Sequence, residues 1–285
     1  MENNFQVNHV SQCDPTSQCI IAKKVCDLCT QRDCLSPIES ENSRLVDPAR
    51  SCEENKIRID NNPALVFDPG DIIQVPLNAN IVRLAGKFTV SECKILSIEP
   101  VGGCGISRQG YWKVTIRFKF CYPIKLFRGD VEVPLEEEVG GSFVPKSSIC
   151  ACTIFQKTVV LFGGQVCKCD DNTVDIAFCN SLYDPCGPYS NEKPFALVQS
   201  EACLLQLELG QGPGVSPTTQ VINATIGLFA IIKTYRIVNM LVQTNGDCLI
   251  EEEPCQDISD DPCEFFNSLD FPFKDFDPAC PAPLE

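Results

Sequence analysis

Residues 111 to 127 read Tyr-Trp-Lys-Val-Thr-Ile-Arg-Phe-Lys-Phe-Cys-Tyr-Pro-Ile-Lys-Leu-Phe, and this stretch decides the fold class. Large apolar side chains alternate here with cationic or hydroxyl side chains. One face carries Trp112, Val114, Ile116, Phe118 and Phe120. Because successive side chains of a strand point to opposite sides, this alternation predicts a strand with one face on a core and one in water. The chain is therefore predicted to be all-β.

Further apolar runs on both sides of this strand are separated by Gly and Pro residues. We predict strands at residues 71–75, 81–92, 94–98, 153–162, 174–178, 195–198, 202–209, 221–232 and 233–244. No long helical period is present, and the turn spacing is typical of antiparallel sandwiches. The body, residues 56–246, is therefore predicted to be a β-sandwich or jelly-roll-like fold, either one unit or two β subdomains meeting near residues 165–172.

Two segments flank this body. Residues 1–55 are polar, contain six cysteines and lack the apolar periodicity that a core requires. They are predicted to form an extended Cys-rich N-terminal arm, ordered by bridges or by a partner, while the body folds without it. Residues 247–285 form an acidic, Phe- and Cys-rich C-terminal tail. Asp261 and Pro262 favour one short helix there, and the phenylalanines predict docking on the body or on a neighbour.

The charge distribution and the apolar runs exclude two classes of partner. The formal net charge is -15. The tail holds one lysine and twelve acidic residues (1 − 12 = −11), which leaves residues 1–246 at 22 − 26 = −4. No basic cluster is available for a nucleic acid. The longest apolar run, residues 224–232, is far shorter than the roughly 20 residues that span a bilayer, so no membrane span is predicted.

The 20 cysteines are the unusual feature of the composition. A chain of 285 residues can bury a sufficient core without disulfides. The first residues lack a basic segment followed by an apolar run, so we expect no secretory signal and synthesis in the cytoplasm. Cytoplasmic thiols normally stay reduced, and the cysteine count therefore conflicts with that compartment.

Bridging is the predicted role of most cysteines, and the sequence leaves their pairing open. The arm and tail cysteines are candidates for bonds between chains: Cys13, Cys19, Cys26, Cys29, Cys34, Cys52, Cys255, Cys263 and Cys280. Candidates for bonds within the chain are Cys104, Cys150, Cys152, Cys167, Cys169 and Cys186. Other cysteines, Cys93, Cys121 and Cys203 among them, lie in or beside predicted strands, where a thiol can act as a small buried hydrophobe.

Metal binding is the alternative for the same residues. The pairs Cys26-x-x-Cys29, Cys150-x-Cys152 and Cys167-x-Cys169 would suit a soft metal ion. A second Cys-x-x-Cys pair is absent, however, so bridging is preferred and neither a metal nor a cofactor is predicted.

No catalytic motif stands out. His9 is the single histidine, and a nucleophile motif such as Gly-x-Ser-x-Gly is absent. The Gly-rich segment 210–214 contains Pro213, which removes a backbone donor, and strands rather than a helix follow it. We therefore predict that the chain is not an enzyme.

Four segments carry a resemblance to a known group of proteins. They are Val-Cys-Asp-Leu-Cys-Thr-Gln-Arg-Asp-Cys-Leu-Ser-Pro (25–37), Gly-Asp-Ile-Ile-Gln-Val-Pro (70–76), Gly-Tyr-Trp-Lys-Val-Thr-Ile-Arg-Phe-Lys-Phe (110–120) and Lys-Thr-Val-Val-Leu-Phe-Gly (157–163). Together they resemble cysteine-rich proteins from clostridial spore formers. The arrangement of a cysteine-rich arm before a sandwich body is also similar to that of endospore-appendage subunits, in which a sandwich domain carries an N-terminal cysteine arm that bonds to neighbouring subunits.

This resemblance implies a function and a route of assembly. It implies a self-assembling structural subunit of a spore coat, exosporium or appendage filament, with itself and other spore-surface proteins as partners. Such a protein is made in the mother-cell cytoplasm and is oxidised once that reducing cell lyses. That order of events removes the conflict between cysteine count and compartment.

Overall fold

A computed structural model describes residues 17–101, 110–164, 177–178, 189–190, 193–211, 218–243 and 262–271. These residues confirm the predicted all-β fold class. No helix in this part of the chain is long and apolar enough to cross a bilayer.

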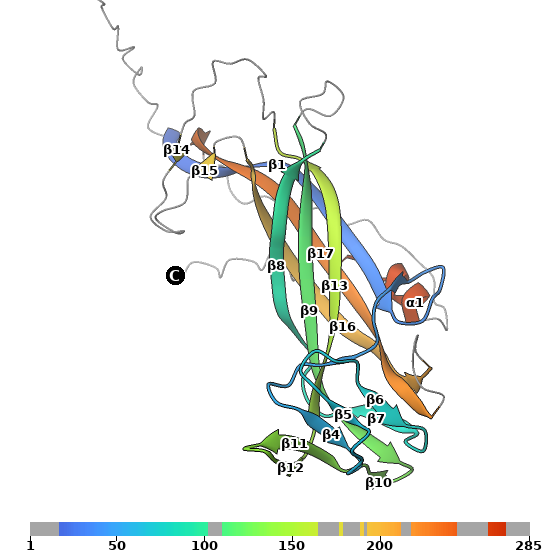
Figure 1. Ribbon diagram of the computed structural model, residues 1–285. Helices are drawn as coiled ribbons and strands as arrows, with labels where there is room; N and C mark the ends of the chain where they lie inside the picture. The colour runs from blue at the N-terminus through green and yellow to red at the C-terminus, as the bar shows by residue number, and fades with distance from the viewer. Residues whose placement is uncertain are drawn as a thin grey trace, which may run out of the picture.

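The described strands form four sheets and are labelled in Figure 1. Sheet A contains β1 (Ser17–Ser36), β2 (Arg44–Leu45), β6 (Gln74–Pro76), β16 (Phe195–Gly210) and β17 (Thr219–Gln243). Sheet B contains β3 (Arg50–Ser51), β7 (Ile81–Leu84), β8 (Thr89–Pro100), β9 (Tyr111–Arg128), β10 (Val131–Glu132) and β13 (Ile149–Phe162). Sheet C contains β4 (Ile57–Ile59), β5 (Val66–Phe67), β11 (Leu135–Val139) and β12 (Ser142–Lys146). Sheet D pairs β14 (Ala177–Phe178) with β15 (Tyr189–Ser190), and α1 spans Pro262–Ser268.

Sheets A and B pack face to face as a sandwich. In Figure 1 the long strands of sheet B lie in front of those of sheet A. Strands β9 and β17 are central in their sheets, and a single hydrophobic core joins their inner faces. That core draws on both sides of segment 165–172, so the described body is one unit rather than two β subdomains.

The stretch that decides the fold class is β9. Even-numbered residues from Trp112 to Leu126 are all buried, whereas the odd-numbered residues are half-buried or exposed. β13 pairs with β9 along its whole length and β8 pairs with the other edge, both antiparallel. The predicted inner face of this strand is therefore confirmed.

Two predicted pairs of strands are each one long strand. β17 replaces the pair predicted at 221–232 and 233–244, and β16 replaces the pair predicted at 195–198 and 202–209. From Val221 to Ile232, β17 is buried on both faces. A strand covered on both sides shows a continuous apolar run instead of an alternation, and such a run does not mark where the strand ends.

The N-terminal segment is not a separate arm, which corrects that prediction for residues 17–51. β1 pairs antiparallel with β17 from Ser17 opposite Gln243 to Leu35 opposite Ile226, with a bulge at Cys26. Most side chains of β1 before Asp33 are half-buried or exposed. The order of this strand comes from its backbone ladder with an apolar partner, and that source of order leaves no apolar pattern in its own sequence.

The described part of the tail docks on the same chain. α1 confirms the predicted short helix, and its Phe266 is fully buried against Phe229 of β17. Phe229 and Ile231 point away from the sandwich core, so α1 covers the second apolar face of β17. Phe271 also packs against Phe229, so both phenylalanines of the tail whose side chains are described contact this face.

Sheet C lies at one end of the sandwich, among the shorter strands at the bottom of Figure 1. The β4–β5 turn contains Asp60 and Asn61 with φ angles of 60° and 54°, a conformation that these two residue types tolerate better than most. β3 leads into β4, and β12 leads into β13. The segment between β3 and β4 therefore lies where sheets B and C meet, and it carries the cysteine described next.

Candidate functional site

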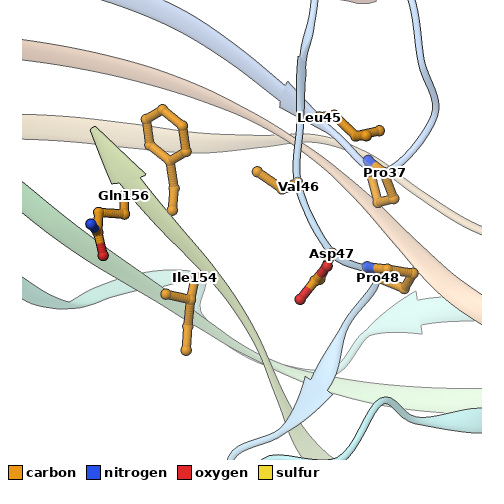
Figure 2. A pocket seen from close by; sticks show the side chains of 8 residues that line it. Pro37, Leu45, Val46, Asp47, Pro48, Ile154 and Gln156 are labelled. Atoms are coloured by element: carbon orange, nitrogen blue, oxygen red, sulfur yellow. The ribbon is translucent and has the colours of Figure 1, made fainter. Parts of the chain in front are cut away.

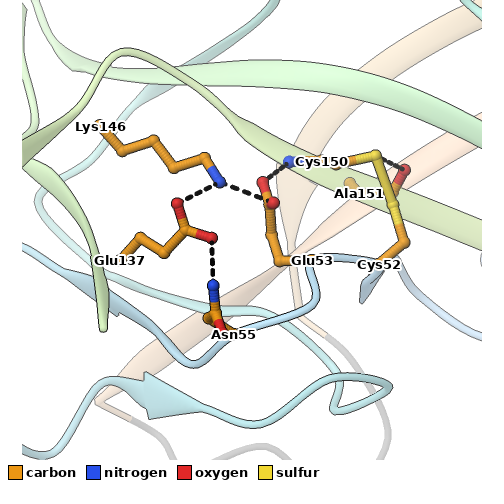
Figure 3. A network of polar contacts seen from close by, with 7 residues as sticks. All are labelled: Cys52, Glu53, Asn55, Glu137, Lys146, Cys150 and Ala151. Atoms are coloured by element: carbon orange, nitrogen blue, oxygen red, sulfur yellow. Dashed lines mark hydrogen bonds and ion pairs between the residues drawn. A yellow bond between two sulfur atoms is a disulfide. The ribbon is translucent and has the colours of Figure 1, made fainter. Parts of the chain in front are cut away.

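A disulfide between Cys52 and Cys150 lies at the junction of sheets B and C (Figure 3). Cys52 follows β3 and Cys150 lies near the start of β13, with their Cα atoms 5.5 Å apart. The backbone amide of Cys52 donates to the carbonyl of Cys150 at 3.0 Å, so the two residues face each other as strand neighbours. Both side chains are half-buried.

A third sulfur lies beside this disulfide. The Sγ atoms of Cys52, Cys121 and Cys150 all lie within 4.8 Å of one another. The sheet register explains this proximity, because Cys121 of β9 is opposite Cys152, and Cys150 is its diagonal neighbour on the same outer face. Cys121 is a free, half-buried thiol, and its Sγ lies 3.0 Å from the hydroxyl of Ser91.

Cys152 completes a cluster of four cysteines at this junction, which we call the junction cluster: Cys52, Cys121, Cys150 and Cys152. Cys152 is a free thiol with 2% of its surface exposed. Burial raises the pKa of this thiol, although the charge of Lys119 opposes the rise. Cys152 is therefore mostly protonated at neutral pH, and the thiol form is a poor nucleophile.

A polar network holds the backbone beside the disulfide in place, as Figure 3 shows. Glu53 accepts hydrogen bonds from the amide of Cys150 at 2.6 Å and from the Lys146 ammonium at 2.6 Å. Lys146 also donates to Glu137 at 2.9 Å. The bond from Lys146 lowers the pKa of Glu137. Burial alone would lower the pKa of Lys146, but the bonds to both carboxylates outweigh it and raise that pKa.

The second disulfide joins Cys34 of β1 to Cys263 of α1, with their Cα atoms 5.4 Å apart. Cys34, Cys52 and Cys263 were all predicted to bond between chains, and the structure pairs each of them within the chain. Cys150 and Cys152 were both predicted to bond within the chain. Cys150 does so, whereas the prediction for Cys152 is wrong, because Cys150 is the residue opposite Cys52 and Cys152 is left as a free thiol. The separations of 229 and 98 residues explain why local sequence context did not reveal these partners.

Outside the junction cluster, two further free thiols are exposed and a third is half-buried. Cys93 on β8 and Cys203 on β16 are exposed, which corrects their interpretation as core residues. Cys26 lies at the bulge of β1 and is half-buried. Burial of part of the side chain raises the pKa of Cys93 and Cys203, so each is mostly protonated at neutral pH. The same cause raises the pKa of Cys29, which packs against the sandwich core.

The remaining predicted bridging cysteines lie outside what the structure describes. For Cys19 the backbone belongs to β1, but its side chain is outside the described set. The others in this group are Cys13, Cys104, Cys167, Cys169, Cys186, Cys255 and Cys280.

A surface hollow of about 360 Å³ separates the segment between β1 and β3 from β13 (Figure 2). It is lined by Pro37, Leu45, Val46, Asp47, Pro48, Ile154, Phe155 and Gln156. Asp47 is the ionisable residue among them, and it is paired with Arg50 at 2.6 Å. This lining contains no thiol, so the junction cluster is the stronger candidate for chemistry.

Comparison of the chain with protein-family models, with curated proteins and with solved structures finds no match. The candidate function therefore rests on the junction cluster, on the surface thiols and on the fold. The sequence analysis placed Cys121 among the cysteines of predicted strands and not among the bridging candidates. The cross-strand register of β9 and β13 is the information that places it beside Cys150 and Cys152.

Proposed function

We propose that this chain is a structural, self-assembling subunit of a bacterial spore surface layer or appendage filament, cross-linked by disulfides within and between chains. The observation that carries the proposal is the placement of Cys26, Cys93 and Cys203. After two in-chain disulfides are made, Cys93 on β8 and Cys203 on β16 remain exposed, and Cys26 on β1 remains half-buried. In the described sheets β8 and β16 are each paired on one side only, and the second side of β1 is paired only at its end, by β2. An edge strand is where another chain can approach most closely.

The two in-chain disulfides support the same proposal because they stabilise the folded chain. One ties the described tail to sheet A, and the other ties the β3–β4 segment to sheet B. In the chain-entropy account, a disulfide that closes a loop of about 100 residues contributes about 4.7 kcal/mol, and a longer loop contributes somewhat more. Such bonds make a subunit that persists on a surface more resistant to unfolding. In an ordinary cytoplasmic protein the same cysteines would stay reduced.

The proposed site of action follows from the resemblance noted in the sequence. The chain is made in the cytoplasm, and oxidation after release of the spore joins it to copies of itself and to other spore-surface proteins. A bond between chains makes docking independent of dilution, because dissociation then requires reduction. Neither a membrane span nor a nucleic acid has a part in this proposal.

Oxidation of the purified, reduced protein is expected to give multimers that survive boiling in SDS and disappear with dithiothreitol. Their formation should accelerate as the pH rises from 7 to 9, because the raised pKa of Cys93 and Cys203 keeps these thiols protonated at the lower pH. Densitometry of gels run with and without reductant measures both effects.

Matched variants test whether the edge-strand thiols contribute. Cys26→Ser/Cys93→Ser/Cys203→Ser is expected to form multimers more slowly than the wild type, whereas Cys152→Ser, which removes a buried thiol, should match it. Oxidised protein that remains monomeric at every pH without reductant would contradict the proposal.

Binding of a soft metal ion by the reduced chain is a second candidate function, favoured by the junction cluster. Once the disulfide is reduced, Cys52, Cys121 and Cys150 offer three thiolates whose sulfurs already lie within 4.8 Å of one another. Thiolate ligands prefer soft or borderline ions, and zinc takes four ligands in a tetrahedron. Cys152 or a water molecule would supply the fourth.

A titration of the reduced, oxygen-free protein with Cd²⁺ tests this second function. A thiolate-to-metal charge-transfer band that saturates near one equivalent is expected, and Cys121→Ser should weaken binding at least tenfold. Cys203→Ser, which removes a thiol outside the cluster, should leave the titration unchanged. Equal affinity of Cys121→Ser and the wild type would exclude this site.

A further inference from the structure

The junction cluster has a property that neither proposed function uses: a free thiol lies next to a disulfide. Cys121 is unpaired, and its Sγ lies within 4.8 Å of both sulfurs of the Cys52–Cys150 bond. Disulfides exchange when a thiolate attacks one of their sulfurs, and the rate depends on access and on which sulfur is attacked. All three sulfur atoms are on one chain, so the attack requires no encounter between molecules.

We propose that Cys121 and the Cys52–Cys150 disulfide form an intramolecular thiol–disulfide exchange site. The Cys121 thiolate attacks Sγ of Cys150, a Cys121–Cys150 bond forms, and the Cys52–Cys150 bond breaks. The electron pair of the broken bond leaves on Sγ of Cys52. Cys121 releases a proton to solvent and Cys52 takes one up. One disulfide and one thiol are present before and after the step, so no oxidant or reductant is consumed.

The order of the strands selects Cys150 as the sulfur that is attacked. Sheet B places β13 between β3 and β9, so Cys150 lies between Cys52 on one side and Cys121 on the other. A Cys52–Cys121 bond would cross two strand spacings, about 9–10 Å between Cα atoms, which exceeds the roughly 7 Å that a disulfide spans.

The same geometry makes the exchanged form the minor one. Cys52 and Cys150 are direct neighbours with Cα atoms 5.5 Å apart, well inside the usual range for a disulfide. Cys121 and Cys150 are diagonal neighbours in the register, and such pairs lie about 7–8 Å apart between Cα atoms. The Cys121–Cys150 bond therefore requires a local movement of the strands. A reagent that captures the Cys52 thiol draws the chain into this form.

The polar network determines where the released thiol can go. Glu53 is held by Lys146 and by the amide of Cys150, so the residue after Cys52 stays fixed to β13 when the disulfide opens. The Cys52 thiol thus remains at the junction of sheets B and C, where it can return to Cys150 or react with an external disulfide. Because the exchange itself takes place within one chain, it is independent of the assembly proposed above.

Alkylation of the disulfide-intact, dilute protein tests the exchange directly. We expect iodoacetamide to label Cys52 in a fraction of the chains, with Cys121 in the same chains bonded to Cys150. Trypsin places Cys52 on residues 51–56, Cys121 on 120–125 and Cys150 on 147–157, so non-reducing peptide mapping separates both forms. The fraction should not depend on protein concentration. Loss of this labelling is expected in Cys121→Ser, and Cys203→Ser serves as the control that keeps it.

A second variant gives a result that does not depend on labelling rates. In Cys52→Ser/Cys152→Ser the resting bond cannot form and the thiol directly opposite Cys121 is absent, so mild oxidation should give a Cys121–Cys150 disulfide. Cys121 and Cys150 both left as thiols would overturn the proposal. Labelling of Cys52 that is as fast in Cys121→Ser as in the wild type would overturn it as well.

Discussion

Asp33→Ala is expected to lower the free energy of unfolding by about 3–5 kcal/mol. The Asp33 side chain is only 2% exposed and accepts hydrogen bonds from Lys157, at 2.5 Å, and from Arg44. Lys157 is itself 9% exposed and belongs to β13, so this ion pair joins sheets A and B along one side of the sandwich. Removing the carboxylate leaves a buried ammonium group without a counter-charge, and chemical denaturation with intact disulfides measures the loss.

Two further variants separate this effect from the loss of any surface ion pair. Asp47→Ala removes a carboxylate that is 65% exposed and paired with Arg50, and it should cost less than about 1 kcal/mol. Asp33→Ala/Lys157→Met removes both buried charges and should recover part of the loss. Equal stability of Asp33→Ala and Asp47→Ala would show that the buried pair does not hold the sheets together.

Phe266→Ala is expected to cost about 3–5 kcal/mol, the second large effect. The ring is fully buried, with its centroid 4.6 Å from that of Phe229, and it fills the space above Gly227 of β17. Truncation leaves a cavity between α1 and sheet A. The Cys34–Cys263 disulfide keeps α1 attached to β1 in this variant. Urea denaturation measures the loss, and faster amide hydrogen exchange in α1 should accompany it.

Phe162→Ala is the matched control for this variant. It removes the same side chain from a site that is 38% exposed and should cost less than about 2 kcal/mol. If Phe266→Ala were no more destabilising than Phe162→Ala, the tail helix would not be a structural part of the folded subunit.

The sequence predicts best the strands that have one face on the core and one face in water. The alternation from Trp112 to Phe120 predicts β9 and its inner face, because each side chain reports directly which side it faces. The Asp-Pro pair at 261–262 likewise predicts the start of α1, because capping is a local property. Both features depend on residues that are neighbours in the sequence.

The features that were not predicted depend on residues far apart in the sequence. β1 is a strand because β17, some 200 residues later, offers it a backbone ladder. The pairing of Cys34 with Cys263 likewise requires α1 to dock on β17 first. The entropic cost of closing a loop rises by only about 0.6 kcal/mol for each doubling of its length, so spacing along the chain carries little information about such partners.

The junction cluster illustrates the same limit for the candidate site. Cys150 and Cys152 form a recognisable pair in the sequence, but Cys121 joins them only through the register of β9 and β13, and Cys52 only through β3. An alternation pattern predicts a face and not a partner, because register is set by the whole ladder and its turns. The position of a thiol beside a disulfide therefore follows only from the folded chain.

Disulfide mapping of a mixed-isotope assembly tests the account most directly. Equal amounts of ¹⁴N and ¹⁵N protein are mixed in the reduced state, oxidised together, digested without reductant and analysed by mass spectrometry. The account predicts linked peptides with one light and one heavy partner at Cys26, Cys93 or Cys203, while Cys34–Cys263 stays entirely light or entirely heavy. Mixed-isotope pairs that are absent at every cysteine would contradict the proposal that this chain is a covalently cross-linked structural subunit.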